Sequence, residues 1–191
     1  GYPAMSFPRE LIVVAMFLFV MGAKGATFKL ADQPIVIFDR IKTTDGLSPG
    51  GVTSIIQDHL GFIWIGTQEG LNHYDGYRIE NYYHEKGDTK SLLNDNIWSL
   101  LSDSSNRLWI GTDSGLNLYN HDSKEFSRFD LGLESPVGQR NAVFVLFEDN
   151  DGNVWVGNGF GLTRIGLDDE LKYYQYDIIN NSIGKGSVRA I

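Results

Sequence analysis

The chain of 191 residues contains no cysteine, and its 16 Lys and Arg residues are outnumbered by 24 Asp and Glu. The absence of cysteine excludes disulfides and thiolate metal sites, and it leaves the redox compartment open. The formal net charge of −8 argues against nucleic acid and anionic membrane surfaces as partners. Contact with a membrane is therefore expected only through segments outside this chain.

Sequence patterns typical of catalytic and metal sites are missing as well. The four histidines match no metal-ligand spacing, no serine lies in a nucleophile elbow, and no pair of carboxylates can be assigned acid and base roles. Asp149–Gly152 resembles the start of a calcium loop, but Phe160 stands where the closing glutamate should be, which favours a hairpin turn. We expect no enzyme activity in this segment, no metal and no cofactor.

Helical periodicity is also absent, because no window carries apolar residues at i, i+3 and i+4 over three turns. Instead, one short phrase recurs about every 45 residues, with a tryptophan at its centre. The three copies are Gly61–Thr67, Asn106–Thr112 and Gly152–Asn158. A fixed period in this range is the signature of a repeat architecture, in which each unit buries its apolar face against a neighbour.

Each repeat reads as four short strands. A β-branched and aromatic run precedes the tryptophan, at Val52–Ile56, Ile97–Leu101 and Val143–Phe147. The tryptophan phrase is the second strand, Leu71–Tyr74 and its equivalents form the third, and the fourth is predicted at Ile79–Tyr83, Phe126–Phe129 and 172–176. Four antiparallel strands in about 45 residues is typical of a β-propeller blade.

The predicted fold is therefore all-β, a partial β-propeller of about three whole blades with an orphan strand at each end. The blades occupy about 40–84, 85–130 and 131–176, within a propeller segment 27–191, and a further blade starts in 182–191. Residues 35–38 match the last strand of a preceding blade, and Ser187–Ile191 match the first strand of a following one. Such a ring is open, and exposed sheet edges favour a homodimer or edge-to-edge association.

The first 26 residues differ from the rest. Arg9 precedes an apolar run, Leu11–Met21, and small residues, Ala23 and Gly25, follow it. This order is typical of a secretory signal peptide, with a retained signal anchor as the alternative. Residues 1–4 are assigned to a tag remnant ahead of an initiator methionine. We therefore expect the mature domain to work outside the cytoplasm.

The repeat resembles the two-component regulator propeller repeat. The first copy carries the pattern over Gly46–Gly76, including Gln57-Asp58 and Gly70-Leu71-Asn72, and the second repeats its central part. The third departs, with Asn158 for threonine, Thr163 for asparagine and Ile165 for tyrosine. The resemblance implies a many-bladed periplasmic sensor region followed by a β-sandwich, a transmembrane helix and a histidine kinase or diguanylate cyclase output. In relatives the cue is often a glycan fragment.

The repeated tryptophans, Trp64, Trp109 and Trp155, are interpreted as core between blades, because they keep strict register with the strands. Trp98 breaks the repeat, and packing remains its first interpretation. Loops entering the first strand, and turns between the second and third, share one face and should contact a ligand. The candidate ligand-binding residues are Gln68, Glu69, Asp95, Asn96, Trp98, Asp113, Arg140, Asn141, Asn158 and Phe160.

Taken together, these patterns indicate a non-enzymatic, ligand-sensing propeller segment of a transmembrane signalling receptor. The expected partner is an oligosaccharide or another small polar molecule. Two alternatives stay open: an extracellular propeller enzyme acting on glycans, and a propeller that docks proteins.

Overall fold

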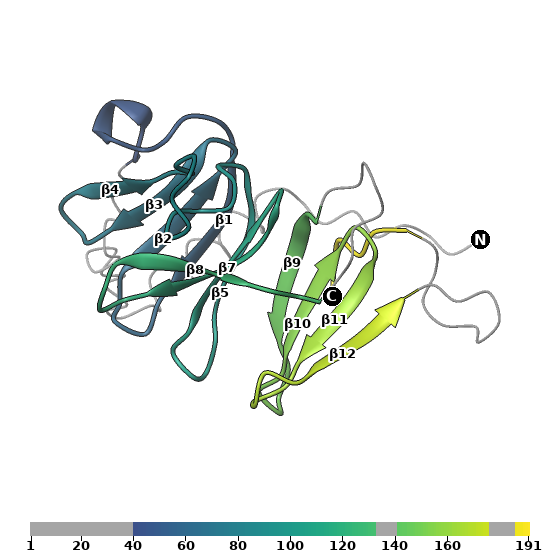
Figure 1. Cartoon of the computed structure of the whole chain (residues 1–191). Coiled ribbons are helices and arrows are strands. Elements are labelled where there is room, and N and C mark those ends of the chain that lie inside the picture. Colours follow the sequence, from purple (N-terminus) through teal and green to yellow (C-terminus); the bar gives the residue numbers. More distant parts are fainter. Residues whose placement is uncertain (1–39, 133–140, 176–185) are drawn as a thin grey trace, which may run out of the picture. The chain divides into compact units, whose positions relative to one another are not determined.

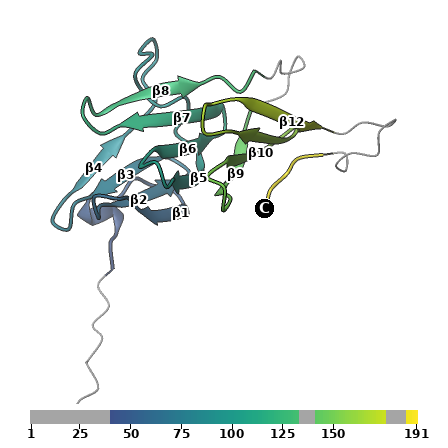
Figure 2. The ribbon, with the colours of Figure 1, turned by 90° about the horizontal axis from the view of Figure 1, so that it is seen from below.

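The computed structural model describes residues 40–132, 141–175 and 186–191. These residues form twelve β-strands and one short 3-10 helix, Thr43–Asp45. The strands are arranged in three antiparallel sheets of four (Figures 1 and 2), and each sheet follows the order of the chain. The predicted all-β propeller architecture is confirmed. Over these same ranges, no helix is long and apolar enough to cross a membrane.

The strand bounds follow the predicted repeats closely. Blade 1 contains β1 (Val52–Gln57), β2 (Ile63–Thr67), β3 (Gly70–Tyr74) and β4 (Ile79–Tyr82). Blade 2 contains β5 (Ile97–Ser102), β6 (Leu108–Thr112), β7 (Gly115–Asn120) and β8 (Glu125–Phe129). Blade 3 contains β9 (Val143–Glu148), β10 (Val154–Asn158), β11 (Gly161–Ile165) and β12 (Leu171–Gln175). The strand predicted at 35–38 lies outside the described residues.

The first strands of successive blades lie next to one another. β5 contacts β1 on one side and β9 on the other, although each of the three pairs only within its own sheet. One polar contact joins two of these strands, because the backbone N–H of Leu100 donates to Oγ of Ser54 at 3.2 Å. First strands side by side with sheets extending outward is the radial arrangement of a propeller.

One turn, repeated in all three blades, fixes the tryptophans. An aspartate opens it, and its Oδ1 accepts backbone N–H groups from the residues two and four positions later, while Oδ2 accepts the indole N–H six positions later. The pairs are Asp58 with Trp64 at 2.8 Å, Asp103 with Trp109 at 2.8 Å and Asp149 with Trp155 at 2.7 Å. Asp149 thus belongs to a hairpin turn, as predicted. The left-handed residue of this turn is Gly61, Asn106 or Gly152, with φ of 90°, 64° and 79°.

The hydrophobic core consists of two seams between blades. Trp64 of blade 1 lies in the first seam and Trp109 of blade 2 in the second, and both are completely buried. Trp155 is only half-buried, with its ring centre 5.5 Å from that of Tyr174. The prediction that the indoles lie between blades is confirmed for Trp64 and Trp109, and it stays a prediction for Trp155, because none of the described residues provides a blade against its face.

Close packing of the blades explains the glycine in each tryptophan phrase. A Cβ at Gly66 would lie 2.7 Å from the side chain of Ile97, and one at Gly111 would lie 2.8 Å from that of Val143. Larger residues at these two positions would push the next first strand away, so the sequence keeps glycine there.

The final segment repeats this contact without forming a strand. A Cβ at Gly157 would lie 2.8 Å from the carbonyl oxygen of Val188 and 3.0 Å from its Cγ1, and the N–H of Val188 donates to the carbonyl of Asn158 at 3.0 Å. The strand predicted at Ser187–Ile191 is therefore wrong as secondary structure, since a strand requires a ladder and only one such bond forms among the described residues. The position of Val188 matches those of Ile97 and Val143, and the assignment of these residues to a further blade stays a prediction.

Candidate ligand-binding site

The candidate site lies at the edge of the blades where the first strand begins and the second strand ends. The residues that pair across this edge are Val52 with Thr67, Ile97 with Thr112 and Val143 with Asn158. A backbone hydrogen bond of 3.1 Å from Asp113 N–H to the carbonyl of Asn96 also joins the turn to the loop. The loops and turns named by the sequence therefore share one edge, which we call the loop edge.

A β-bulge interrupts each first strand immediately after it begins. The ladder to the second strand skips one residue per blade, namely Thr53, Trp98 and Phe144. Bulges re-aim side chains and are common beside functional sites. The repeats thus place a variable side chain at the same point of the loop edge in every blade.

Two of these bulge residues belong to a continuous row of side chains. The indole N–H of Trp98 donates to Oδ1 of Asp113 at 3.3 Å, and the Trp98 ring meets that of Phe144 edge-on, with centroids 5.5 Å apart. The guanidinium of Arg189 lies 4.6 Å from the centre of the Phe144 ring, within cation–π range. We call Asp113, Trp98, Phe144 and Arg189 the aromatic row.

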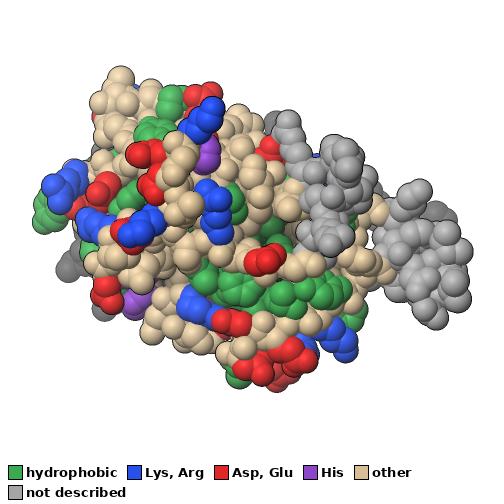
Figure 3. Space-filling view, in the orientation of Figure 1, with side chains coloured by type: hydrophobic (Ala, Val, Ile, Leu, Met, Phe, Trp, Pro, Cys, Tyr) green, Lys and Arg blue, Asp and Glu red, His purple; other side chains and the backbone are tan. Residues whose placement is uncertain are grey.

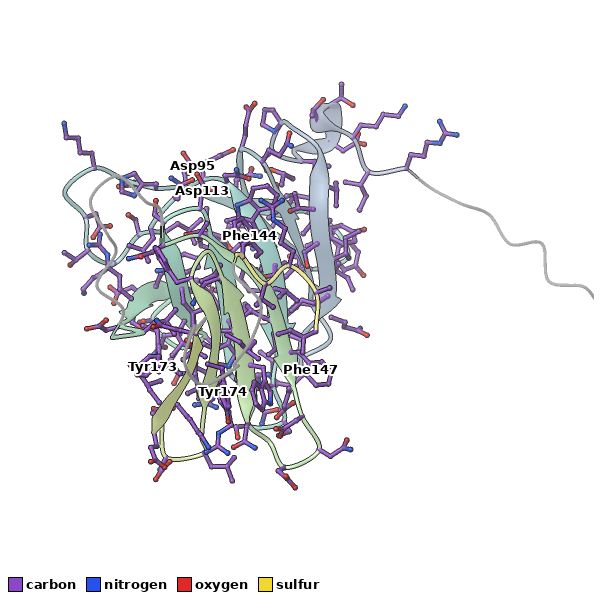
Figure 4. All side chains as sticks on the ribbon, turned by 90° about the vertical axis from the view of Figure 1, so that its right-hand side faces the viewer. Asp95, Asp113, Phe144, Phe147, Tyr173 and Tyr174 are labelled. Carbon is purple, nitrogen blue, oxygen red and sulfur yellow. The ribbon has the colours of Figure 1, made fainter. Side chains whose placement is uncertain are left out.

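Figure 4 shows where this row lies along the blades. Asp95, Asp113 and Phe144 lie toward one end, whereas Phe147, Tyr173 and Tyr174 lie toward the other. The labelled aromatic residues of blade 3 are therefore divided between two regions, and Phe144 is the one of these that lies at the loop edge.

A cavity of about 240 Å³ lies between blades 2 and 3. Three predicted ligand-binding residues, Asn141, Asn158 and Phe160, line it together. The other lining residues are Leu93, Ser114, Gly115, Leu116, Arg128, Phe129, Asp130 and Leu131. We call this space the seam cavity. Figure 3 shows hydrophobic side chains gathered in a band on the molecular surface, with acidic and basic side chains beside it.

Some buried polar atoms at the loop edge have no hydrogen-bond partner within the described part of the chain. They are Oγ1 of Thr53, Oδ1 of Asn96 and Nδ2 of Asn158. Buried polar groups are satisfied in the great majority of cases, so each of these atoms is a place where a water or a ligand atom would be stabilised.

Four other predicted site residues lie outside the row and the cavity, and three of them make hydrogen bonds that hold the loops. Gln68 and Glu69 are exposed and belong to neither the row nor the cavity, and the amide oxygen of Gln68 accepts the N–H of Gly51 at 3.3 Å. Oδ1 of Asp95 accepts the N–H of His84 at 2.6 Å, which closes the loop before β5, and the carbonyl of Asn96 holds the turn described above.

Arg140 lies outside the described residues. Sequence reasoning missed Arg189, Arg128 and Phe129. A signal for Arg189 was present, because it follows Phe144 by one repeat and therefore occupies the bulge position. Arg128 and Phe129 could not be recognised in the same way, since they enter the site from the end of an outer strand.

The histidines with shifted pKa values lie away from this edge. Burial lowers the pKa of His73 and of His121, and both side chains belong to the seam between blades 1 and 2. His121 follows β7, and strands alternate in direction, so it lies at the end opposite the loop edge. In the described ranges no group of three or more His, Asp or Glu side chains is arranged to hold a metal ion.

Comparison with known proteins finds repeats of one family over part of the chain. The two-component regulator propeller family matches residues 46–69, 91–114 and 138–160. A histidine kinase named P4 from Formosa agariphila is 36% identical over 79 residues, which are 41% of this chain and 6% of that protein.

Solved structures of two extracellular domains share the fold of this chain. The extracellular domain of one hybrid two-component system from B. thetaiotaomicron is 28% identical, with a TM-score of 0.62, over 72% of this chain and 20% of that one. A second such domain from the same organism is 24% identical, with a TM-score of 0.60, over 71% of this chain and 18% of that one, and shows the fold alone. The chain thus spans about a fifth of those domains.

Proposed function

Because the chain is built from repeats of the two-component regulator propeller family, we propose that it is a ligand-sensing segment of an extracellular sensor domain. In this proposal the segment lies in the periplasm, and its parent protein passes the signal to a histidine kinase. The ligand is an oligosaccharide or another small polar molecule, which is bound and released unchanged.

The convergence of variable side chains at the loop edge carries this proposal. Trp98 and Phe144 differ from Thr53 at the bulge position, and Asn158 and Phe160 differ from Thr67 and Glu69 in the turn. By contrast, the strands and the turns in which an aspartate accepts the indole N–H carry similar residues at equivalent positions of these blades. Aromatic faces beside amides and charged groups suit sugars, whose rings are apolar on one face and carry hydroxyl groups at the edge.

Signalling requires that the ligand bind one arrangement of the receptor better than another. The aromatic row and the seam cavity both contain residues from more than one blade, and Arg189 comes from the segment that follows blade 3. A ligand across these residues would therefore sense the spacing of the blades. Its leverage on the output is limited to the difference in its affinity for the two arrangements.

Thermal unfolding of the full chain against a panel of neutral and acidic oligosaccharides tests the proposal. A ligand at 100 times its Kd adds about 2.7 kcal/mol to stability, which raises Tm measurably. We expect at least one such sugar to raise Tm and to be recovered intact by chromatography. Trp98→Thr, which restores the blade 1 residue, should reduce the shift. A panel without any shift, or a cleaved sugar, contradicts the proposal.

A further inference from the structure

Asn158 lines the seam cavity and departs there from the other two repeats. It is 1% exposed, it lines the cavity, and it replaces the threonine found at the same place in blades 1 and 2. The replacement leaves a buried amide in a position that a hydroxyl group otherwise fills.

The threonines satisfy both of their hydrogen-bonding capacities within the turn. Oγ1 of Thr67 donates to the carbonyl of Gly70 at 3.1 Å and accepts the N–H of Glu69 at 3.1 Å. Thr112 repeats both bonds, at 2.9 Å with Gly115 and 3.2 Å with Ser114. A hydroxyl group at this position is therefore complete without a ligand.

The amide of Asn158 completes only one of these bonds. Its Oδ1 accepts the N–H of Phe160 at 2.8 Å, whereas its Nδ2 has no partner within the described ranges. A buried donor left unpaired costs roughly 1–3 kcal/mol, so an acceptor atom that comes within hydrogen-bonding distance of Nδ2 would be strongly favoured.

The other lining residues indicate which kind of molecule would supply that acceptor atom. Leu93, Phe129 and Leu131 give the cavity apolar walls, while Arg128 and Asp130 supply a cation and an anion. An ion of either sign would meet a like charge there, but a molecule with several hydroxyl groups can donate to the carboxylate and accept from the guanidinium. The volume of about 240 Å³ lies below the roughly 300–1,000 Å³ of drug-sized sites, which limits the occupant to about one ring.

We propose that the seam cavity between blades 2 and 3 binds a single neutral sugar ring, one of whose oxygen atoms accepts a hydrogen bond from Nδ2 of Asn158. This inference rests on the proposed function, because it assigns one unit of the sensed molecule to this cavity. Phe160 borders the ring, and the aromatic row receives the remainder of a longer ligand.

Variants taken from the other repeats test this site without disturbing the fold. Asn158→Thr restores the residue of blades 1 and 2, whose turn is complete, and Phe160→Ser restores that of blade 2. The control is Asp122→Asn, at an exposed position that belongs to neither the row nor the cavity lining. Circular dichroism and thermal unfolding of each variant show whether it folds.

Saturation-transfer NMR with the full chain and the methyl glycosides of glucose, galactose, mannose, xylose and arabinose gives the readout. We expect at least one glycoside to bind the parent chain and Asp122→Asn equally. Asn158→Thr should weaken that binding about tenfold, the equivalent of about 1.4 kcal/mol. Phe160→Ser should weaken it as well.

Two results would overturn the assignment. One is the absence of binding by every glycoside, and the other is unchanged binding by folded Asn158→Thr. The proposed function fails separately, when no oligosaccharide shifts Tm. An oligosaccharide whose affinity depends on Trp98 and not on Asn158 would retain the sensor function and remove the sugar from the cavity.

Discussion

The indole N–H of Trp109 donates a 2.8 Å hydrogen bond to Oδ2 of Asp103, and this carboxylate oxygen also accepts from Nε of Arg107 at 2.6 Å. Arg107 in turn covers the indole, with its guanidinium 4.7 Å from the ring centre. Three side chains within seven residues of the chain therefore all contact one another. Asp103 is almost completely buried, and these partners satisfy its carboxylate oxygen.

Asp103→Asn should destabilise the chain by about 3 kcal/mol. The substitution replaces Oδ2 by a group that cannot accept from the indole, and it leaves the guanidinium beside an uncharged side chain. Urea unfolding followed by tryptophan fluorescence measures the change. Asp122→Asn, at an exposed position of the same blade, is the control and should stay within about 0.5 kcal/mol of the parent.

The hydrogen bond between aspartate and indole should also make stability depend on pH, and the effect is clearest in blade 3. The hydrogen bond from Trp155 is the largest cause that lowers the pKa of Asp149, to about 2 from an ordinary 3.8. Because the folded-state pKa is depressed, ionised Asp149 stabilises the fold fully above pH 3.8. This contribution declines as the pH falls toward 2 and is absent below it.

Removing the indole donor should return the pKa of Asp149 toward 3.8. Carboxyl-carbon NMR of Trp155→Phe measures this directly, and Trp98→Phe should leave the Asp149 titration unchanged. An Asp149 midpoint that is the same in the parent and in Trp155→Phe would show that the indole does not hold the carboxylate ionised.

Gly111→Ala tests the close approach of blades 2 and 3. A Cβ there would lie 2.5 Å from Oγ of Ser99 and 2.9 Å from the carbonyl oxygen of Val143, and the latter belongs to a backbone that cannot move easily. We expect a loss of about 2 kcal/mol in the free energy of unfolding. Gly51→Ala is the control, because its Cβ would meet nothing closer than 3.7 Å. Equal stability of the two variants would contradict the packing argument.

The fold could be predicted because the sequence contains three copies of the same repeat. Strand bounds and the shared loop edge follow from aligning the repeats, and the structure agrees. An aspartate, Asp58, Asp103 or Asp149, also stands six residues before each tryptophan. The acceptance of the indole N–H by that aspartate depends on how the strand folds back, and spacing alone does not specify it.

The candidate site was predicted less completely, for a physical reason. Its residues depart from the repeat, so their neighbours depend on how two blades pack together. Asn141, Asn158 and Phe160 were named as loop residues and do meet in one cavity, but Arg128 and Phe129 arrive from an outer strand of the preceding blade. Asp95 was named because a carboxylate at the mouth of a strand can contact a ligand. In the structure its Oδ1 accepts the backbone N–H of His84.

The uncovered face of blade 3 gives the last prediction. Leu101 and Phe147 occupy equivalent positions, since each pairs across the sheet with the tryptophan of its blade. Leu101 packs into the seam between blades 2 and 3, whereas Phe147 is 45% exposed. Leu101→Ala should cost about 2 kcal/mol, because it removes contacts and opens a cavity, and Phe147→Ala should cost well under about 1 kcal/mol.

Urea unfolding of both alanine variants in the 191-residue chain measures the difference. If Phe147→Ala proved as costly as Leu101→Ala, the face of blade 3 would be covered in solution. Sedimentation at several protein concentrations would then distinguish a second copy of the chain, whose coverage weakens on dilution, from coverage by the chain itself, which does not.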